Sequence, residues 1–172
     1  MDGRANPRLR VFLADDHPLV LRGMKMLIAN DAGLELVGEA ADGPSALERA
    51  IELKPDVAVL DLWMPGLKGL DVARQFLSAC PTSRVLVLTV HEDEAYLRKV
   101  LQFGITGYIL KRSATDELAR GIHAVAAGDL YLDPYFSSHK PDNELALRQL
   151  ARLVGLEAFN RTVDGLKRDT IH

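Results

Sequence analysis

The sequence predicts an α/β fold, in which a doubly wound parallel sheet of five strands carries helices on both faces. Short apolar runs alternate with longer segments of helical period between residues 9 and 127, and this alternation is typical of βαβ units. Turn and capping residues separate the segments. Since crossovers between parallel strands are almost always right-handed, successive units of this kind build a doubly wound sheet.

Five apolar runs have the length expected of buried strands. Each is short, mostly apolar and bounded by polar or turn residues. We expect strands at Leu9–Ala14, Leu34–Ala40, Val57–Leu60, Arg84–Leu88 and Thr106–Ile109.

Helices are expected after each strand. Asp42 is a candidate cap for the second helix, with Pro44 in its first turn, and Ser113 offers a capping hydroxyl to the fifth. Gly104 and Gly128 follow the last residues of the fourth and fifth helices, where a left-handed cap favours glycine. The expected helices are Pro18–Ala29, Pro44–Leu53, Lys68–Ser78, Asp93–Phe103 and Thr115–Ala127.

Composition indicates a soluble globular protein. Of 172 residues, 48% are hydrophobic and 26% are charged. The net charge of −3 gives no overall attraction to nucleic acid or acidic lipid. A single cysteine, Cys80, excludes an internal disulfide. No apolar run approaches the roughly 18 residues of a membrane span, and no signal peptide is recognisable, so we expect a cytoplasmic protein.

The chain divides into four parts. Residues 1–8 are expected to be a disordered N-terminus, 9–134 the α/β domain, 135–141 a linker and 142–172 a helical tail. Apolar positions in the tail have helical spacing at 144–154 and again at 159–171.

Polar side chains follow the ends of four predicted strands. Asp15 and Asp16 follow the first strand, Asp61 the third, Thr89 the fourth and Lys111 the fifth. Because the carboxyl ends of parallel strands meet at one edge, where open α/β sheets bind ligands, we expect these side chains to converge.

The three carboxylates would repel one another and raise their pKa values unless a cation holds them. Oxygen ligands without histidine or cysteine at metal spacing favour Mg²⁺ over zinc. Such a site recruits phosphate, and the free oxygen of Asp61 could attack phosphorus to form an acyl phosphate. Lys111 would pair with the phosphoryl oxygens and Thr89 would donate a hydrogen bond to another.

Four short stretches carry a resemblance to a known family. They are Leu13-Ala-Asp-Asp16-His-Pro18, Val59-Leu-Asp61-Leu-Trp-Met-Pro-Gly66, Leu88-Thr89-Val-His91 and Gly107-Tyr-Ile-Leu-Lys111. Together they resemble the CheY-like receiver domain of bacterial two-component response regulators, and most closely the subfamily whose receiver precedes a LuxR-type helix-turn-helix. The resemblance covers Leu9 to Pro134 and implies the flavodoxin-like strand order 2-1-3-4-5.

The resemblance also implies roles for the acidic residues. Asp61 would be the phosphoacceptor for a sensor histidine kinase. Asp15, Asp16 and Asp61 would hold Mg²⁺ together with the backbone carbonyl of Trp63. Such a domain catalyses only its own phosphorylation and dephosphorylation, so we expect no enzyme with a separate substrate.

The remaining matched residues would sense the phosphoryl group. Thr89 and Lys111 would contact it, and Tyr108 matches the switch aromatic, which would enter the space that Thr89 vacates. Val90 and His91 flank the site, and by analogy they tune the access of water to it.

In this family the switch changes one surface, which makes homodimers or docks partners. It corresponds here to Asp93–Phe103, Thr106–Ile109 and Thr115–Ala127. We therefore expect a phosphorylation-dependent homodimer and a role in transcription regulation. DNA contact would need an output domain that is not recognisable in residues 142–172, which are either a helical appendage or a truncated or reduced output region.

Three other functions fit parts of the same residue pattern. An aspartate-nucleophile phosphatase needs a second acid two residues after the nucleophile, where this chain has Trp63. A flavodoxin-like nucleotide binder needs a phosphate loop after the first strand, where Asp15 and Asp16 would repel phosphate. The third alternative is a receiver-like interaction module that works without phosphorylation.

Overall fold

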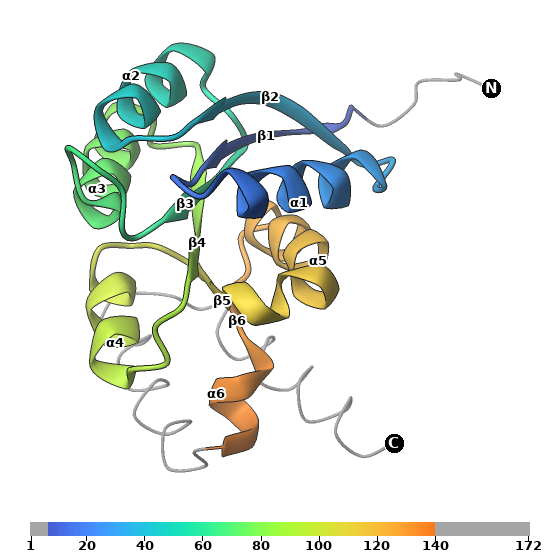
Figure 1. Ribbon diagram of the computed structural model, residues 1–172, viewed down its shortest axis with the longest axis vertical. Helices are drawn as coiled ribbons and strands as arrows, with labels where there is room; N and C mark the ends of the chain where they lie inside the picture. The colour runs from blue at the N-terminus through green and yellow to red at the C-terminus, as the bar shows by residue number, and fades with distance from the viewer. Residues whose placement is uncertain (1–6, 140–172) are drawn as a thin grey trace.

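A six-stranded parallel sheet forms the centre of the structure, a computed structural model that describes residues 7–139 (Figure 1). The strand order is β2-β1-β3-β4-β5-β6, and all neighbouring strands are parallel. The strands are β1 Leu9–Ala14, β2 Leu34–Ala40, β3 Val57–Asp61, β4 Arg84–Thr89, β5 Gly107–Leu110 and β6 Tyr131–Leu132.

Helices cover both faces of this sheet, which confirms the predicted flavodoxin-like class (Figure 1). Helices α1 and α5 pack on one face, whereas α2, α3 and α4 pack on the other. The five predicted helices begin and end within one residue of the observed ones. The helices are α1 Pro18–Ala29, α2 Gly43–Leu53, α3 Gly69–Ala79, α4 Glu94–Gln102, α5 Ala114–Ala126 and α6 Pro134–His139, with a 3₁₀ turn at Lys111–Ser113.

Strand β3 shows how the sequence pattern orients the domain. Val57 and Val59 belong to the apolar cluster under α1 and α5, whereas Ala58 and Leu60 belong to the cluster under α2, α3 and α4. All four are fully buried, because alternate residues of a strand face opposite sides and helices cover both. Asp61 therefore comes at the end of a rigid, completely buried strand.

The last part of the domain differs from the sequence prediction. Strand β6 adds a sixth strand to the expected order 2-1-3-4-5, and α6 occupies most of the segment expected to be a linker at 135–141. The buried carboxylate of Asp133 accepts hydrogen bonds from the backbone N–H groups of Leu110 and Tyr135, both at 2.9 Å. Asp133 thus connects this part of the chain to β5 and lies at the start of α6. The sequence did not predict β6, because a strand of two residues is too short to show a periodic pattern.

Some expectations concern parts of the chain outside the described residues. The expected disorder of residues 1–8 falls mostly there, and the helical tail at 142–172 falls there entirely. Between residues 7 and 139, every helix is too short or too polar to cross a membrane.

Candidate functional site

The carboxyl edge of the sheet brings together an aspartate pair and a lysine. The Lys111 ammonium lies 2.9 Å from Asp15 Oδ2 and 3.1 Å from Asp61 Oδ2. Asp15 and Asp61 are only 1% and 3% exposed, since Asp15 directly follows β1 and Asp61 is the last residue of β3. Three residues from three separate strand ends therefore meet, as their positions in the sequence predicted.

Asp16 and His17 lie at the same edge and form, with Asp15 and Asp61, a cluster of possible metal ligands. One ligand atom from each of Asp15, Asp16, His17 and Asp61 lies within 4.8 Å of the others. His17 Nδ1 is 3.0 Å from a carboxylate oxygen of both Asp15 and Asp16. The sequence prediction gave His17 no role, although it directly follows the aspartate pair.

The donor set suits a hard divalent cation. Asp15 Oδ2 and Asp16 Oδ1 are buried and have no well-aligned hydrogen-bond donor within residues 7–139. The nitrogen atoms beside them are Lys111 Nζ, 2.9 Å from Asp15 Oδ2, and His17 Nδ1, 3.0 Å from Asp16 Oδ1. Buried carboxylate oxygens left without hydrogen bonds are costly unless a cation compensates them. The three carboxylates therefore fit Mg²⁺, which prefers oxygen ligands.

The electrostatics of the pair follow from burial and charge. Burial raises the pKa of Asp61 and the charge of Asp15 raises it further, whereas the Trp63 N–H, 3.2 Å from Asp61 Oδ1, and Lys111 oppose the rise. Burial alone would lower the pKa of Lys111, but its interactions with the carboxylates of Asp15 and Asp61 outweigh burial and raise it. The Lys111 ammonium is thus kept in its charged form, whereas the ionised form of Asp61 is disfavoured by burial and by the charge of Asp15.

Replacing Lys111 by methionine is expected to destabilise the fold by about 1–3 kcal/mol at pH 7, because two buried carboxylates lose their cation. Folding raises the pKa of Lys111, so its stabilising contribution is fully present below the ordinary lysine value of about 10.5. It is lost only as the pH rises through the raised value. Urea unfolding from pH 6 to 8 should therefore show a constant difference.

The control is Lys99→Met, since the Lys99 side chain is exposed on α4. This change should alter the free energy of unfolding by less than about 0.5 kcal/mol. Equal losses in the two variants would show that the Lys111 ion pairs contribute nothing specific to stability.

Thr89 and Tyr108 lie beside this edge and contact the loop between β4 and α4. Thr89 is fully buried, and its hydroxyl accepts a hydrogen bond from the His91 N–H at 3.1 Å. The Tyr108 hydroxyl donates to the His91 carbonyl at 2.8 Å. The Tyr108 ring is fully buried, with its centroid 5.5 Å from that of Phe136 in α6. The Tyr108 ring therefore lies in the interior of the domain in this structure.

Trp63 and His91 form an aromatic cluster with Tyr96 of α4, which the sequence prediction did not include. The Trp63 Nε1–H group donates to His91 Nε2. The His91 ring stacks on Tyr96 at 5.0 Å between centroids, and Trp63 lies 6.1 Å from Tyr96. Val90, in contrast, is 66% exposed. The cluster joins the loop after Asp61 to α4.

A flavodoxin-like sheet with an aspartate–lysine pair and an acidic group at its carboxyl edge defines a receiver-type α/β domain. The family model of the response regulator receiver domain matches residues 11–123. The chain therefore belongs to the response regulator receiver family of two-component systems.

Individual relatives agree with this assignment. The response regulator GacA of Pseudomonas viridiflava is 36% identical over 152 residues, covering 88% of this chain and 69% of GacA. The receiver domain of the putative response regulator NarL from Mycobacterium tuberculosis is 36% identical, with a TM-score of 0.68 over 72% of this chain and 99% of that one. A LuxR-family response regulator from Aurantimonas gives 33% identity and a TM-score of 0.74, over 80% and 99%.

Proposed function

We propose that this protein is a phosphorylation-dependent switch that accepts a phosphoryl group on Asp61 from a sensor histidine kinase and thereby regulates transcription. The observation that carries the proposal is the buried meeting of Asp15, Asp61 and Lys111 at 2.9 and 3.1 Å. Asp61 is buried at an electrostatic cost and lies beside a charged lysine, so it is suited to act as the nucleophile that attacks a phosphoryl group.

Asp15, Asp16, Asp61 and the backbone carbonyl of Trp63 would hold Mg²⁺, which when bound supplies positive charge that lets an anionic phosphoryl group approach the carboxylates. One oxygen of Asp61 bonds to phosphorus as the bond from phosphorus to the donor breaks, and the leaving group keeps the electron pair. The Lys111 ammonium pairs with the phosphoryl oxygens and neutralises charge on them. The protein acts only on itself in this reaction.

The output follows from the contacts of Thr89 and Tyr108. When the Thr89 hydroxyl turns to a phosphoryl oxygen, it leaves the His91 N–H, which it contacts at 3.1 Å in this structure. The His91 backbone then keeps its contact with the Tyr108 hydroxyl at 2.8 Å. Because Tyr108 also packs on Phe136, the change reaches α4, β5 and α6 together. We propose that this surface controls homodimerisation or an output region.

The competing functions find less support at the site. In a phosphatase, the residue two positions after Asp61 would be an acid that faces the substrate, whereas Trp63 bonds to His91. A nucleotide-binding protein would have its phosphate loop directly after β1, but this chain has the buried Asp15 and the half-buried Asp16 at that position.

The test is intact mass of the full chain after incubation with Mg²⁺ and acetyl phosphate, followed by light scattering. We expect a gain of one phosphoryl group, no gain when EDTA replaces Mg²⁺, and a doubling of the mass in solution on phosphorylation if the output is dimerisation. A chain that stays unmodified with Mg²⁺ while it still binds a partner would instead be a phosphorylation-independent interaction module.

A further inference from the structure

A groove between α3 and α4 lies outside the proposed phosphorylation site, and its α4 side, at Tyr96, Lys99 and Phe103, belongs to the segment 93–103 of the surface expected to switch. Its volume is about 270 Å³. Leu62 and Leu70 line it from the α3 side, and Tyr96 and Phe103 line it from the α4 side. Phe103 is 39% exposed, which leaves a large apolar side chain in contact with solvent beside an apolar floor. Leu62, Leu70 and Tyr96 also pack in the core cluster of the domain, so Phe103 is the exposed apolar side chain of this groove.

The rim of the same groove is basic. Lys68, Arg74 and Lys99 line it with a single carboxylate, Asp71, and the three basic residues are exposed. Arg74 reaches Asp71 only at 3.9 Å, and Lys99 makes no ion pair within the described part of the chain. This excess of positive charge stands on a chain whose net charge is −3. The groove thus combines an apolar floor with cations that lack strong partners.

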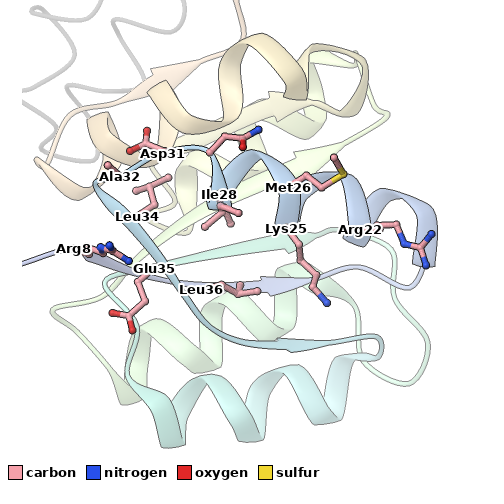
Figure 2. A pocket seen from close by; sticks show the side chains of 12 residues that line it. Arg8, Arg22, Lys25, Met26, Ile28, Asp31, Ala32, Leu34, Glu35 and Leu36 are labelled. Atoms are coloured by element: carbon pink, nitrogen blue, oxygen red, sulfur yellow. The ribbon is translucent and has the colours of Figure 1, made fainter.

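A wider hollow between α1 and β2 provides a contrast (Figure 2). Its lining includes three basic residues, Arg8, Arg22 and Lys25, together with Asp31, and the Lys25 ammonium pairs with Glu39 at 2.9 Å. Glu35 supplies a further negative charge there. Two acidic residues thus line this hollow with three basic ones, whereas a single carboxylate lines the groove between α3 and α4 with three basic residues.

Size and charge together identify the occupant. Pockets for drug-sized molecules are typically about 300–1,000 Å³, so a groove of about 270 Å³ suits the anchoring side chain of a peptide better than a whole cofactor. We propose that the groove between α3 and α4 binds an acidic peptide segment of a partner protein. One apolar side chain of the peptide enters between Leu70 and Phe103, and flanking carboxylates pair with Lys68, Arg74 and Lys99.

This peptide site is connected to Asp61 through Trp63. The Lys68 ammonium lies 5.8 Å from the centroid of the Trp63 ring, and Tyr96 lies 6.1 Å from it. An occupant that moves Lys68 or Tyr96 therefore also acts on the loop that follows Asp61. Coupling between binding sites is reciprocal, so phosphorylation changes the affinity for the peptide. This second step rests on the proposed function, whereas peptide binding itself does not.

The binding test uses the unphosphorylated full chain and the fluorescence of Trp63, the single tryptophan. The probes are peptides of about ten residues with a central Leu or Phe flanked by glutamates, and the same peptides with Gln for Glu. We expect the glutamate peptides to change the fluorescence in a saturable way, and the glutamine peptides to bind at least about tenfold more weakly. Raising NaCl from about 50 to about 500 mM should weaken binding, because the contacts are exposed charges.

Variants in which a basic residue is replaced by glutamate test where the peptide binds. Lys99→Glu and, separately, Arg74→Glu should each weaken binding about tenfold. Arg22→Glu makes the same change on an exposed residue of α1, on the opposite face of the sheet, and should leave the affinity within about twofold. Thermal unfolding of each variant checks that it is folded. The proposal is overturned if no glutamate peptide binds, if glutamine peptides bind equally well, or if Arg22→Glu weakens binding as much as the other two.

Discussion

Asp61→Asn is expected to abolish phosphoryl incorporation from acetyl phosphate and, at the same time, to make the folded protein more stable. Incorporation stops because an amide has no anionic oxygen to attack phosphorus. Stability rises because Asp61 is 3% exposed and lies beside Asp15, so its charge is held in the fold at a cost. Removing a charge from such a site gives a gain on the order of 1 kcal/mol.

The pH dependence of this gain has a defined sign. Burial raises the pKa of Asp61 above its unfolded value. The wild-type protein therefore loses stability, relative to the variant, as the pH rises through the pKa of the folded state. The gain from Asp61→Asn should be largest at pH 7 and should disappear below the unfolded pKa of about 3.9. Urea midpoints measured in EDTA between pH 3.5 and 7 follow this change without interference from Mg²⁺.

Asp56→Asn is the matched control, since it makes the same change at the opposite end of β3. Asp56 is exposed, and its Oδ2 accepts the Arg10 N–H at 2.8 Å, a bond that an asparagine oxygen can also accept. This variant should incorporate a phosphoryl group like the wild type. Modification of Asp61→Asn at the wild-type rate would place the acceptor on another residue and end the proposed role of Asp61.

The sequence predicted the location of those site residues that directly follow or end a strand. Asp15, Asp61 and Lys111 each follow an apolar run, and parallel strands bring such positions to one edge regardless of the loops. The regular period likewise placed the helices within one residue of the observed ends. The predicted Asp42 cap accepts a hydrogen bond from the Ser45 N–H, whereas Ser113 makes no side-chain cap hydrogen bond. Where a side chain is held by regular secondary structure, periodicity alone determines its neighbourhood.

Contacts between loops could not be predicted in this way. Trp63 and His91 are separated by 28 positions and meet through loops whose paths have no period. The Tyr108 ring packs on Phe136, a residue of the segment expected to be a linker. Both features depend on side-chain packing of short irregular segments, for which the sequence contains no repeating signal.

Gly69→Ala is expected to be strongly destabilising, because α3 begins in contact with the backbone that carries Asp61. A Cβ atom on Gly69 would lie 2.0 Å from the carbonyl oxygen of Asp61 and 2.7 Å from the Cα of Leu62. Both are backbone atoms at the end of a buried strand, so no side-chain rotation relieves the overlap. Either α3 or the end of β3 must move. We expect a loss of about 3 kcal/mol or more, measured by urea unfolding.

Gly23→Ala distinguishes this overlap from the general effect of adding a methyl group. Gly23 lies within α1, and a Cβ there would meet nothing within 4 Å. Alanine is the better helix former by roughly 0.5–1 kcal/mol, so this variant should be slightly more stable than the wild type. Any Gly69→Ala protein that still folds should also take up phosphoryl groups more slowly than Gly23→Ala, because the shift displaces Asp61 from Lys111. Wild-type stability and phosphorylation in both variants would mean that α3 does not approach Asp61 this closely.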